Sequence, residues 1–122
     1  MISVEEVEII HAILIRNFGG ADGVRDINAL ESALARPFQT FDGNELYPDY
    51  RQKAACLLES ILINHPFIDG NKRTGYTLMR LYLMRFSTDL RATPDEKYSL
   101  VVGVAAGTLR YDDILNWINS HT

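Results

Sequence analysis

The stretch His65-Pro66-Phe67-Ile68-Asp69-Gly70-Asn71-Lys72-Arg73 decides how this chain is organised, because apolar residues at helical spacing flank it on both sides. Pro66 discourages continuation of the preceding helix, and Gly70 permits a tight turn. The stretch therefore predicts a short loop between two helices, with Phe67 as its apolar anchor. It also combines an imidazole, a carboxylate, an amide and two cations. We expect these groups to share one small pocket.

The polar residues of this loop suit the chemistry of phosphate. His65 can accept a proton near neutral pH, and Asp69 offers a hard oxygen ligand to Mg²⁺. Gly70 permits a backbone conformation in which the following N–H groups point at an anion. Phosphoryl or nucleotidyl transfer needs such positioning and electrostatic stabilisation, with little covalent work by the protein.

The second half of the loop predicts an anion site. Asn71, Lys72 and Arg73 begin the next helix, whose N-terminal dipole and free N–H groups attract phosphate. Cations at this end of a helix oppose its dipole, so two of them together indicate a bound anion. The alternative is a plain turn between helices, in which Lys72 and Arg73 are solvated.

Composition and charge limit the classes of protein to which this chain can belong. The chain has 122 residues, a net charge of −4 and one cysteine, Cys56. We expect one domain over residues 1–122, in a reducing compartment, since one cysteine excludes an intrachain disulfide. No signal peptide is visible and no apolar run is long enough for a membrane, so we expect a cytoplasmic protein. The acidic charge argues against direct binding of nucleic acid.

Helical periodicity extends over most of the chain. Capping residues and stop signals predict six helices: one from the cap at Ser3 to Gly19-Gly20, one between Asp26 and Pro37, and others over about 49–64, 71–86, 94–107 and 111–120. Asp42-Gly43 predicts a turn and a small hairpin or flap in the connection over residues 38–49. The fold class is therefore all-α, with one small β-hairpin.

The loop resembles the signature of the Fic/Doc superfamily, His-Pro-Phe-x-(Asp/Glu)-Gly-Asn-Gly-Arg-x-x-Arg. Seven positions match it: His65, Pro66, Phe67, Asp69, Gly70, Asn71 and Arg73. Two positions depart, since Lys72 replaces the second Gly and Tyr76 replaces the final Arg. Asn-Lys-Arg-Thr is similar to the Doc (death-on-curing) branch. Further similarity to that branch lies in Gly19-Gly20, in residues 23–26 and 30–37, and in Leu46-Tyr47-Pro48.

This resemblance implies a single-domain Fic/Doc-type helical bundle and a transfer reaction. Most Fic-type enzymes transfer AMP from ATP to a hydroxyl, and the final Arg and second Gly seat the phosphates. Doc-type members bind the nucleotide reversed and transfer the γ-phosphate to a Thr of elongation factor Tu, which halts translation. Lys72 and Tyr76 favour the second reaction, because both disturb the usual pose of the triphosphate. AMP transfer, or a non-enzymatic binding module with a retained pocket, remains the alternative.

The roles implied for individual residues follow the motif, with ATP and Mg²⁺ as cofactors. His65 is the expected general base, Asp69 the metal ligand, and Arg73 a third catalytic residue. The expected phosphate-binding residues are Gly70, Asn71, Lys72, Arg73 and Thr77. The flap of this family pairs with an extended target segment, which assigns target docking to Asn44, Glu45, Leu46 and Tyr47 unless these residues form an ordinary solvent loop.

Control is expected from a separate protein. Self-inhibited Fic proteins carry the pattern (Ser/Thr)-x-x-x-Glu-(Gly/Asn), and no Ser or Thr of this chain has Glu four residues later. A Phd-like antitoxin, folding as a helix in a groove on this chain, is therefore the expected partner.

Six other residues have plainer interpretations. Lys53 and Arg80 either reach the phosphates or lie on solvated helix faces. Cys56 and Trp117 are expected in the core. The remaining histidines, His11 and His121, lack ligand-spaced partners and are expected to be structural or on the surface. No zinc, P-loop or EF-hand pattern is present.

Overall fold

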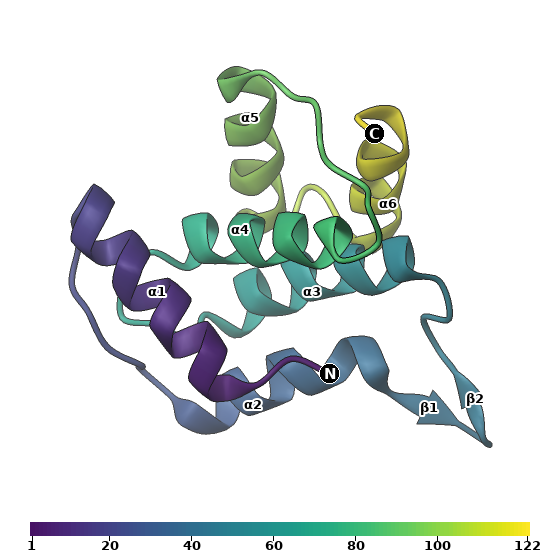
Figure 1. Ribbon diagram of the computed structural model, residues 1–122, viewed down its shortest axis with the longest axis horizontal. Coiled ribbons are helices and arrows are strands. Elements are labelled where there is room, and N and C mark those ends of the chain that lie inside the picture. Colours follow the sequence, from purple (N-terminus) through teal and green to yellow (C-terminus); the bar gives the residue numbers. More distant parts are fainter.

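Six α-helices and one small hairpin follow each other along the chain in a computed structural model, which describes residues 1–122 (Figure 1). The helices are α1 (Val4–Phe18), α2 (Ile27–Ala35), α3 (Tyr50–Asn64), α4 (Asn71–Met84), α5 (Pro94–Ala105) and α6 (Tyr111–Ser120). A 3₁₀ turn covers Arg36–Phe38, and the strands are β1 (Thr40–Phe41) and β2 (Asn44–Glu45). The predicted all-α class with a hairpin is confirmed, although α4 ends two residues before Phe86.

Side-chain caps explain where several helices begin. The carboxylate of Asp26 accepts hydrogen bonds from the backbone N–H groups of Asn28 and Ala29, at 3.0 and 3.2 Å. Thr93 and Glu96 bond each other's backbone N–H groups in a reciprocal capping box at the start of α5. Such caps satisfy N–H groups that have no partner inside the helix, so these boundaries were readable from the sequence.

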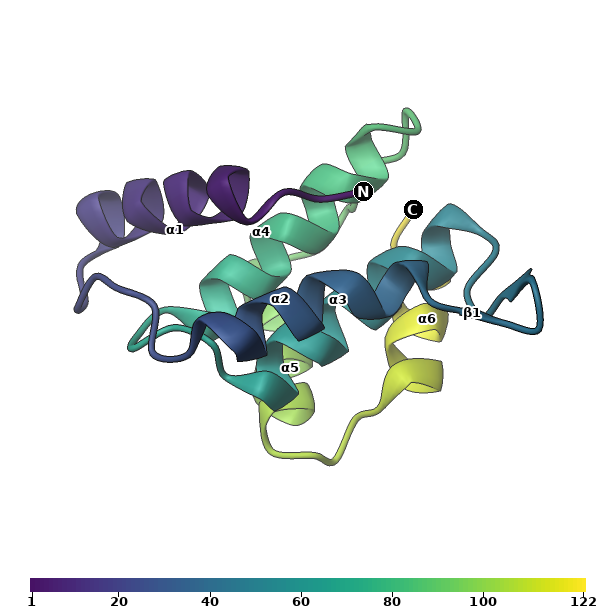
Figure 2. The ribbon, with the colours of Figure 1, turned by 90° about the horizontal axis from the view of Figure 1, so that it is seen from below.

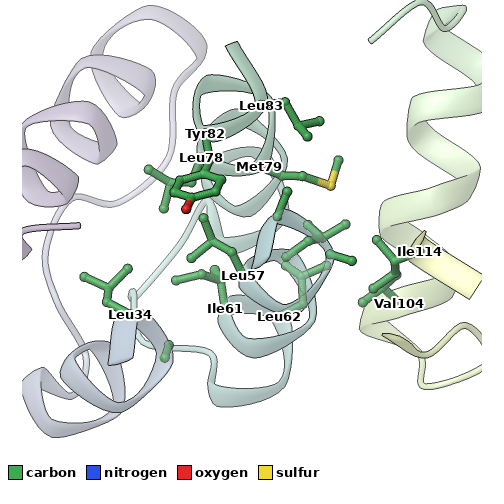
Figure 3. Packing of buried hydrophobic residues seen from close by; sticks show 14 of the residues in the cluster. Leu34, Leu57, Ile61, Leu62, Leu78, Met79, Tyr82, Leu83, Val104 and Ile114 are labelled. Atoms are coloured by element: carbon green, nitrogen blue, oxygen red, sulfur yellow. The ribbon is translucent and has the colours of Figure 1, made fainter. Parts of the chain in front are cut away.

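Helices α3 and α4 form the centre of the molecule and supply half of its buried hydrophobic core (Figures 1 and 3). Leu57, Ile61 and Leu62 of α3 face the buried side chains of α4, among them Leu78 and Met79 (Figure 3). The two helices approach closely at a glycine: a Cβ added to Gly75 would lie 3.2–3.4 Å from Leu58, Ile61 and Leu62. The expected core positions are also occupied, since Cys56 is buried and Trp117 packs against the core.

A buried carboxylate joins α6 to this centre. Glu59 of α3 is only 2% exposed and accepts hydrogen bonds from Arg36 at 2.7 Å, Arg110 at 3.2 Å and the backbone N–H of Tyr111 at 2.8 Å. Burial raises the pKa of Glu59, but these hydrogen bonds outweigh it and hold the pKa below the ordinary value. The ionised carboxylate thus ties three segments together.

The hairpin lies where the predicted turn allows it. Asp42 and Gly43 both have positive φ, 54° and 80°, as a tight hairpin turn requires. Thr40 pairs with Glu45 and Phe41 with Asn44 in the antiparallel ladder. Both views place the hairpin beyond the N-terminal end of α3, away from the α3–α4 loop (Figures 1 and 2).

Lys53 holds this hairpin to the body of the molecule. Its Nζ donates to Glu45 Oε1 at 2.8 Å and to the carbonyl oxygen of Tyr47. The side chain is therefore neither a phosphate ligand nor part of a solvated face, the two interpretations open from the sequence.

None of the helices has the length and hydrophobicity that crossing a lipid bilayer requires.

Candidate active site

The connection between α3 and α4 is held by the segment that precedes α2. His65 ends α3 with left-handed φ and ψ of 50° and 55°. The Arg25 guanidinium donates to the carbonyls of Asn64 and His65, at 2.9 and 2.7 Å, and so satisfies acceptors that the helix end leaves free. Backbone bonds from Arg25 N to Pro66 O at 2.7 Å, and from Ile68 N to Gly23 O at 3.1 Å, pair the two segments.

Phe67 anchors the loop in the core, as the sequence predicts. Its side chain is fully buried and stacks on His11 of α1, with ring centroids 4.0 Å apart and planes 7° apart. The Nε2 atom of His11 also lies 2.8 Å from the carbonyl oxygen of Asp69. His11 is only 2% exposed, so it is a buried support beneath the loop and the structural expectation is correct.

Asn71 sets the position of His65. The Asn71 side chain accepts from the N–H of Phe67 and donates to the carbonyl of Phe67, both at 3.0 Å. This two-point pairing fixes which end of the amide is nitrogen. The second N–H of Asn71 Nδ2 then points at His65 Nδ1, 2.6 Å away, and selects the neutral tautomer with a lone pair on Nδ1.

Asp69 presents an ionised carboxylate at the surface of the loop. Its oxygens accept from the backbone N–H groups of Ala21 at 3.2 Å and Gly70 at 2.8 Å. These two bonds hold the pKa of Asp69 below its usual range. Gly20 makes this approach possible, because a Cβ there would lie 2.7 Å from Asp69 Oδ2. The carboxylate stays exposed and able to bind a cation.

The first turn of α4 leaves three donors free. Thr74 N makes the first bond of this helix, to the carbonyl of Gly70 at 2.9 Å. The backbone N–H groups of Asn71, Lys72 and Arg73 bond to no protein acceptor. Such N–H groups, with the positive end of the helix dipole, are suited to bind an anion.

A cavity of about 650 Å³ opens over this turn. Its lining consists of His65, Ile68, Asp69, Gly70, Asn71, Lys72, Arg73, Tyr76, Thr77, Lys97, Tyr98 and Val101. The cationic side chains among them, Lys72, Arg73 and Lys97, form no salt bridge with any carboxylate. In a chain of net charge −4, the cavity therefore gathers three cations that have no salt-bridge partner, together with the single carboxylate of Asp69.

The structure brings the predicted loop residues together but leaves the hairpin apart. The predicted catalytic and phosphate-binding residues, His65, Asp69, Gly70, Asn71, Lys72, Arg73 and Thr77, all line the cavity. The hairpin residues Asn44, Glu45, Leu46 and Tyr47 do not line it. They precede α3, whose 15 residues span about 22 Å, whereas His65 follows that helix. Target docking by the hairpin remains a prediction.

Arg73 and Arg80, two cations of α4, make different contacts. The Arg73 guanidinium lies 4.3 Å from the ring centroid of Phe18, an exposed residue at the end of α1. Arg80 instead makes a two-pronged ion pair with Asp89, at 2.8 and 3.1 Å, and does not line the cavity. Of the two possibilities open for Arg80, contact with phosphate is therefore not supported.

Sequence reasoning missed the opposite wall of the cavity. Lys97, Tyr98 and Val101 all belong to α5. The motif ends before this helix, and the sequence of α5 contains no motif of its own. The only feature of the sequence that could have indicated this wall is the adjacent cation and aromatic ring of Lys97 and Tyr98.

Comparison with known proteins identifies the family of this chain. A family model described as "Fic/DOC family" matches residues 1–83, more than half of the chain. The chain therefore belongs to the Fic/Doc family, and the resemblance seen in the loop is confirmed. It is 46% identical over 66 residues to "Toxin Doc" of Mycolicibacterium smegmatis, an alignment that covers 54% of this chain and 51% of that protein.

A second relative extends the similarity over nearly the whole chain. "Protein kinase doc" of Escherichia phage P1 is 30% identical over 113 residues, which cover 93% of this chain and 88% of that protein. Both relatives support the Doc branch. The chain thus spans about half the length of the first relative and most of the second.

Proposed function

We propose that this chain is a Doc-like toxin that transfers the γ-phosphate of ATP to a Thr or Ser hydroxyl of a protein, with elongation factor Tu as the target. The observation that carries the proposal is the anion site at the start of α4. Three free N–H groups and the unpaired cations Lys72 and Arg73 lie there beside His65 and Asp69. Relatives named as a toxin and as a protein kinase support the same class of activity.

Lys72 and Tyr76 support phosphoryl transfer over AMP transfer. AMP-transferring members of the family use Gly and Arg at these positions to seat the phosphates. Here the Tyr76 ring packs edge-on against Trp117, with centroids 6.3 Å apart, and its hydroxyl is buried without a hydrogen-bond partner. This position offers no guanidinium, so Lys72 and Arg73 are the cationic side chains of α4 at the cavity that can bind phosphate.

His65 acts as the proton acceptor in the proposed reaction. The target hydroxyl oxygen forms a bond to the γ-phosphorus, the bond from that phosphorus to the bridging oxygen breaks, and ADP leaves with the electron pair. In the tautomer that Asn71 selects, the basic lone pair of the ring is on Nδ1, where it accepts the N–H of the Asn71 amide. The hydroxyl must therefore reach Nδ1 in place of the Asn71 amide and give up its proton there.

Asp69 fits Mg²⁺ held between protein and phosphates. No group of three or more metal-ligating side chains exists in the structure, so a resident metal centre is not supported. One exposed carboxylate is, however, the contribution that Mg²⁺ takes from proteins when phosphate oxygens and water fill its other positions. When bound, the ion would neutralise charge on the phosphates.

Replacing Asp69 by asparagine should remove the magnesium dependence of ATP binding while the fold persists. An amide keeps the size of the side chain and can still accept from Ala21 or Gly70, but it loses the charge that attracts the ion. Calorimetric titration of ATP with and without Mg²⁺ measures the effect. Asp112→Asn, which changes an exposed carboxylate outside the cavity that makes no hydrogen bond or salt bridge, is the matched control. Equal magnesium dependence in Asp69→Asn and the parent protein would contradict the assignment.

Intact mass spectrometry of purified elongation factor Tu, incubated with this chain, ATP and Mg²⁺, tests the proposed reaction. We expect a gain of one phosphate on the target. A gain of one AMP would instead establish the alternative transfer. If elongation factor Tu stays unmodified while labelled phosphate enters other proteins of a lysate, the choice of target is wrong and the transfer reaction remains.

A toxin of this kind also needs control. The chain lacks the inhibitory sequence pattern of self-inhibited relatives, and Tyr76 replaces the arginine that its glutamate would engage. A Phd-like antitoxin in trans is therefore part of the proposal. Its C-terminal segment would be disordered alone and would fold as a helix on binding.

A further inference from the structure

Helix α5 forms the wall of the cavity that faces the α3–α4 loop. Lys97 and Val101 lie one helical turn apart and so share a face, and Tyr98 adjoins them. These residues follow residue 83, where the match to the Fic/DOC family ends. The family match therefore assigns these three residues no role.

Lys97 lies over the ring of Tyr76 and has no salt-bridge partner. Its Nζ lies 5.7 Å from the ring centroid of Tyr76 and forms no salt bridge. Asp89 is near enough for Lys97 to contribute to its pKa of about 2, after the larger effects of Arg80 and Leu90 N–H. The Asp89 carboxylate is already paired with Arg80 by two hydrogen bonds. The charge of Lys97 thus remains available to the cavity.

A third cation on the opposite wall changes what the site can bind. Lys72 and Arg73 come from the first turn of α4, whereas Lys97 comes from α5. Cations on two facing walls suit a chain of several phosphates better than a single phosphate, because separate phosphates can meet separate charges.

Tyr98 supplies an apolar surface at the same cavity. Its side chain is 69% exposed and pairs with no other aromatic ring of the protein. Ile68, which is 54% exposed, and the half-buried Val101 also line the cavity. An exposed aromatic ring beside apolar side chains is the kind of surface on which a nucleobase stacks.

We infer that α5 supplies half of the nucleotide site: Lys97 binds the polyphosphate across from Lys72 and Arg73, and Tyr98 stacks on the base. This inference rests on the proposed function, since it takes the ligand to be a nucleoside triphosphate. It assigns binding to two residues outside the signature loop. It also predicts that the contributions of the phosphates and of the base can be separated by substitution.

Calorimetric titration of Mg²⁺-ATP and of Mg²⁺-tripolyphosphate separates the contribution of the phosphates from that of the base. Lys97→Gln should weaken both ligands by about tenfold, as for the loss of one charge-assisted hydrogen bond. Tyr98→Ala should weaken ATP by about 5- to 150-fold, the range for loss of one base stacking on an aromatic ring, and leave tripolyphosphate unchanged. The matched controls are Arg91→Gln and Phe41→Ala, an exposed cation and an exposed ring outside the cavity. Circular dichroism confirms that each variant is folded.

The outcomes distinguish this inference from the proposed function. If the parent chain binds ATP and modifies its target, but both α5 variants bind the two ligands as the parent does, the role of α5 is wrong and the proposed function stands. Equal loss of ATP and tripolyphosphate in Tyr98→Ala would contradict stacking on the base. A parent chain that binds neither ligand would overturn the proposed function and this inference together.

Discussion

Replacing His65 by alanine should lower the rate of transfer by about 10²–10⁴-fold at saturating ATP, the usual effect of losing a general base. The side chain lies at the cavity, and its Nδ1 is positioned by Asn71. Since His65 is exposed and makes no core contact, the fold should persist. Single-turnover measurement with saturating ATP and target separates this chemical defect from weaker binding.

His121→Ala is the matched control for this experiment. His121 lies at the C-terminal end, where it bonds the carbonyl of Trp117 at 2.7 Å and Glu96 at 3.0 Å, away from the cavity. The control should transfer phosphate at the parent rate. Parent-like turnover by His65→Ala would show that another group accepts the proton.

Replacing Phe67 by alanine should reduce the free energy of unfolding by about 3–5 kcal/mol, as for other large residues removed from a core. The side chain is fully buried and stacks on His11, so its loss leaves a cavity under the loop and removes the contact that holds the loop to α1. Because domains of this size are stable by only about 5–15 kcal/mol, the loss is a large fraction of the total.

Urea denaturation measures this effect, with Phe41→Ala as the control. Phe41 is 75% exposed in the hairpin, so the same change there should alter stability by less than about 0.5 kcal/mol. A change below about 1 kcal/mol in Phe67→Ala would mean that the loop does not depend on its anchor. Phe67→Leu, which keeps much of the apolar volume, should recover part of the stability.

Local features of the fold were predictable because they depend on residues close in sequence. Asp26 caps the helix that it immediately precedes, and Asp42-Gly43 turns the chain between adjacent strands. The signature loop likewise contains most of its own hydrogen-bonding partners, such as Asn71 and Phe67. In these cases the interacting groups lie within a few residues of one another, where spacing alone is informative.

Long-range partners could not be predicted in this way. His11 meets the carbonyl of Asp69 from 58 residues away, and Lys97 reaches the cavity from a helix with no motif of its own. Nothing in the residues near Lys53 indicates that it holds the hairpin rather than phosphate. Such contacts depend on how helices cross, which helical periodicity leaves undetermined.

The two walls of the cavity come from different parts of the chain, so they are synthesised one after the other. His11 supports the loop from below, the loop forms one wall, and α5 forms the other. During synthesis the loop emerges from the ribosome before Lys97 and Tyr98 do, because they follow it in the sequence. The nucleotide site proposed for this protein would therefore be incomplete during synthesis, and phosphate transfer would begin only after α5 has emerged and packed.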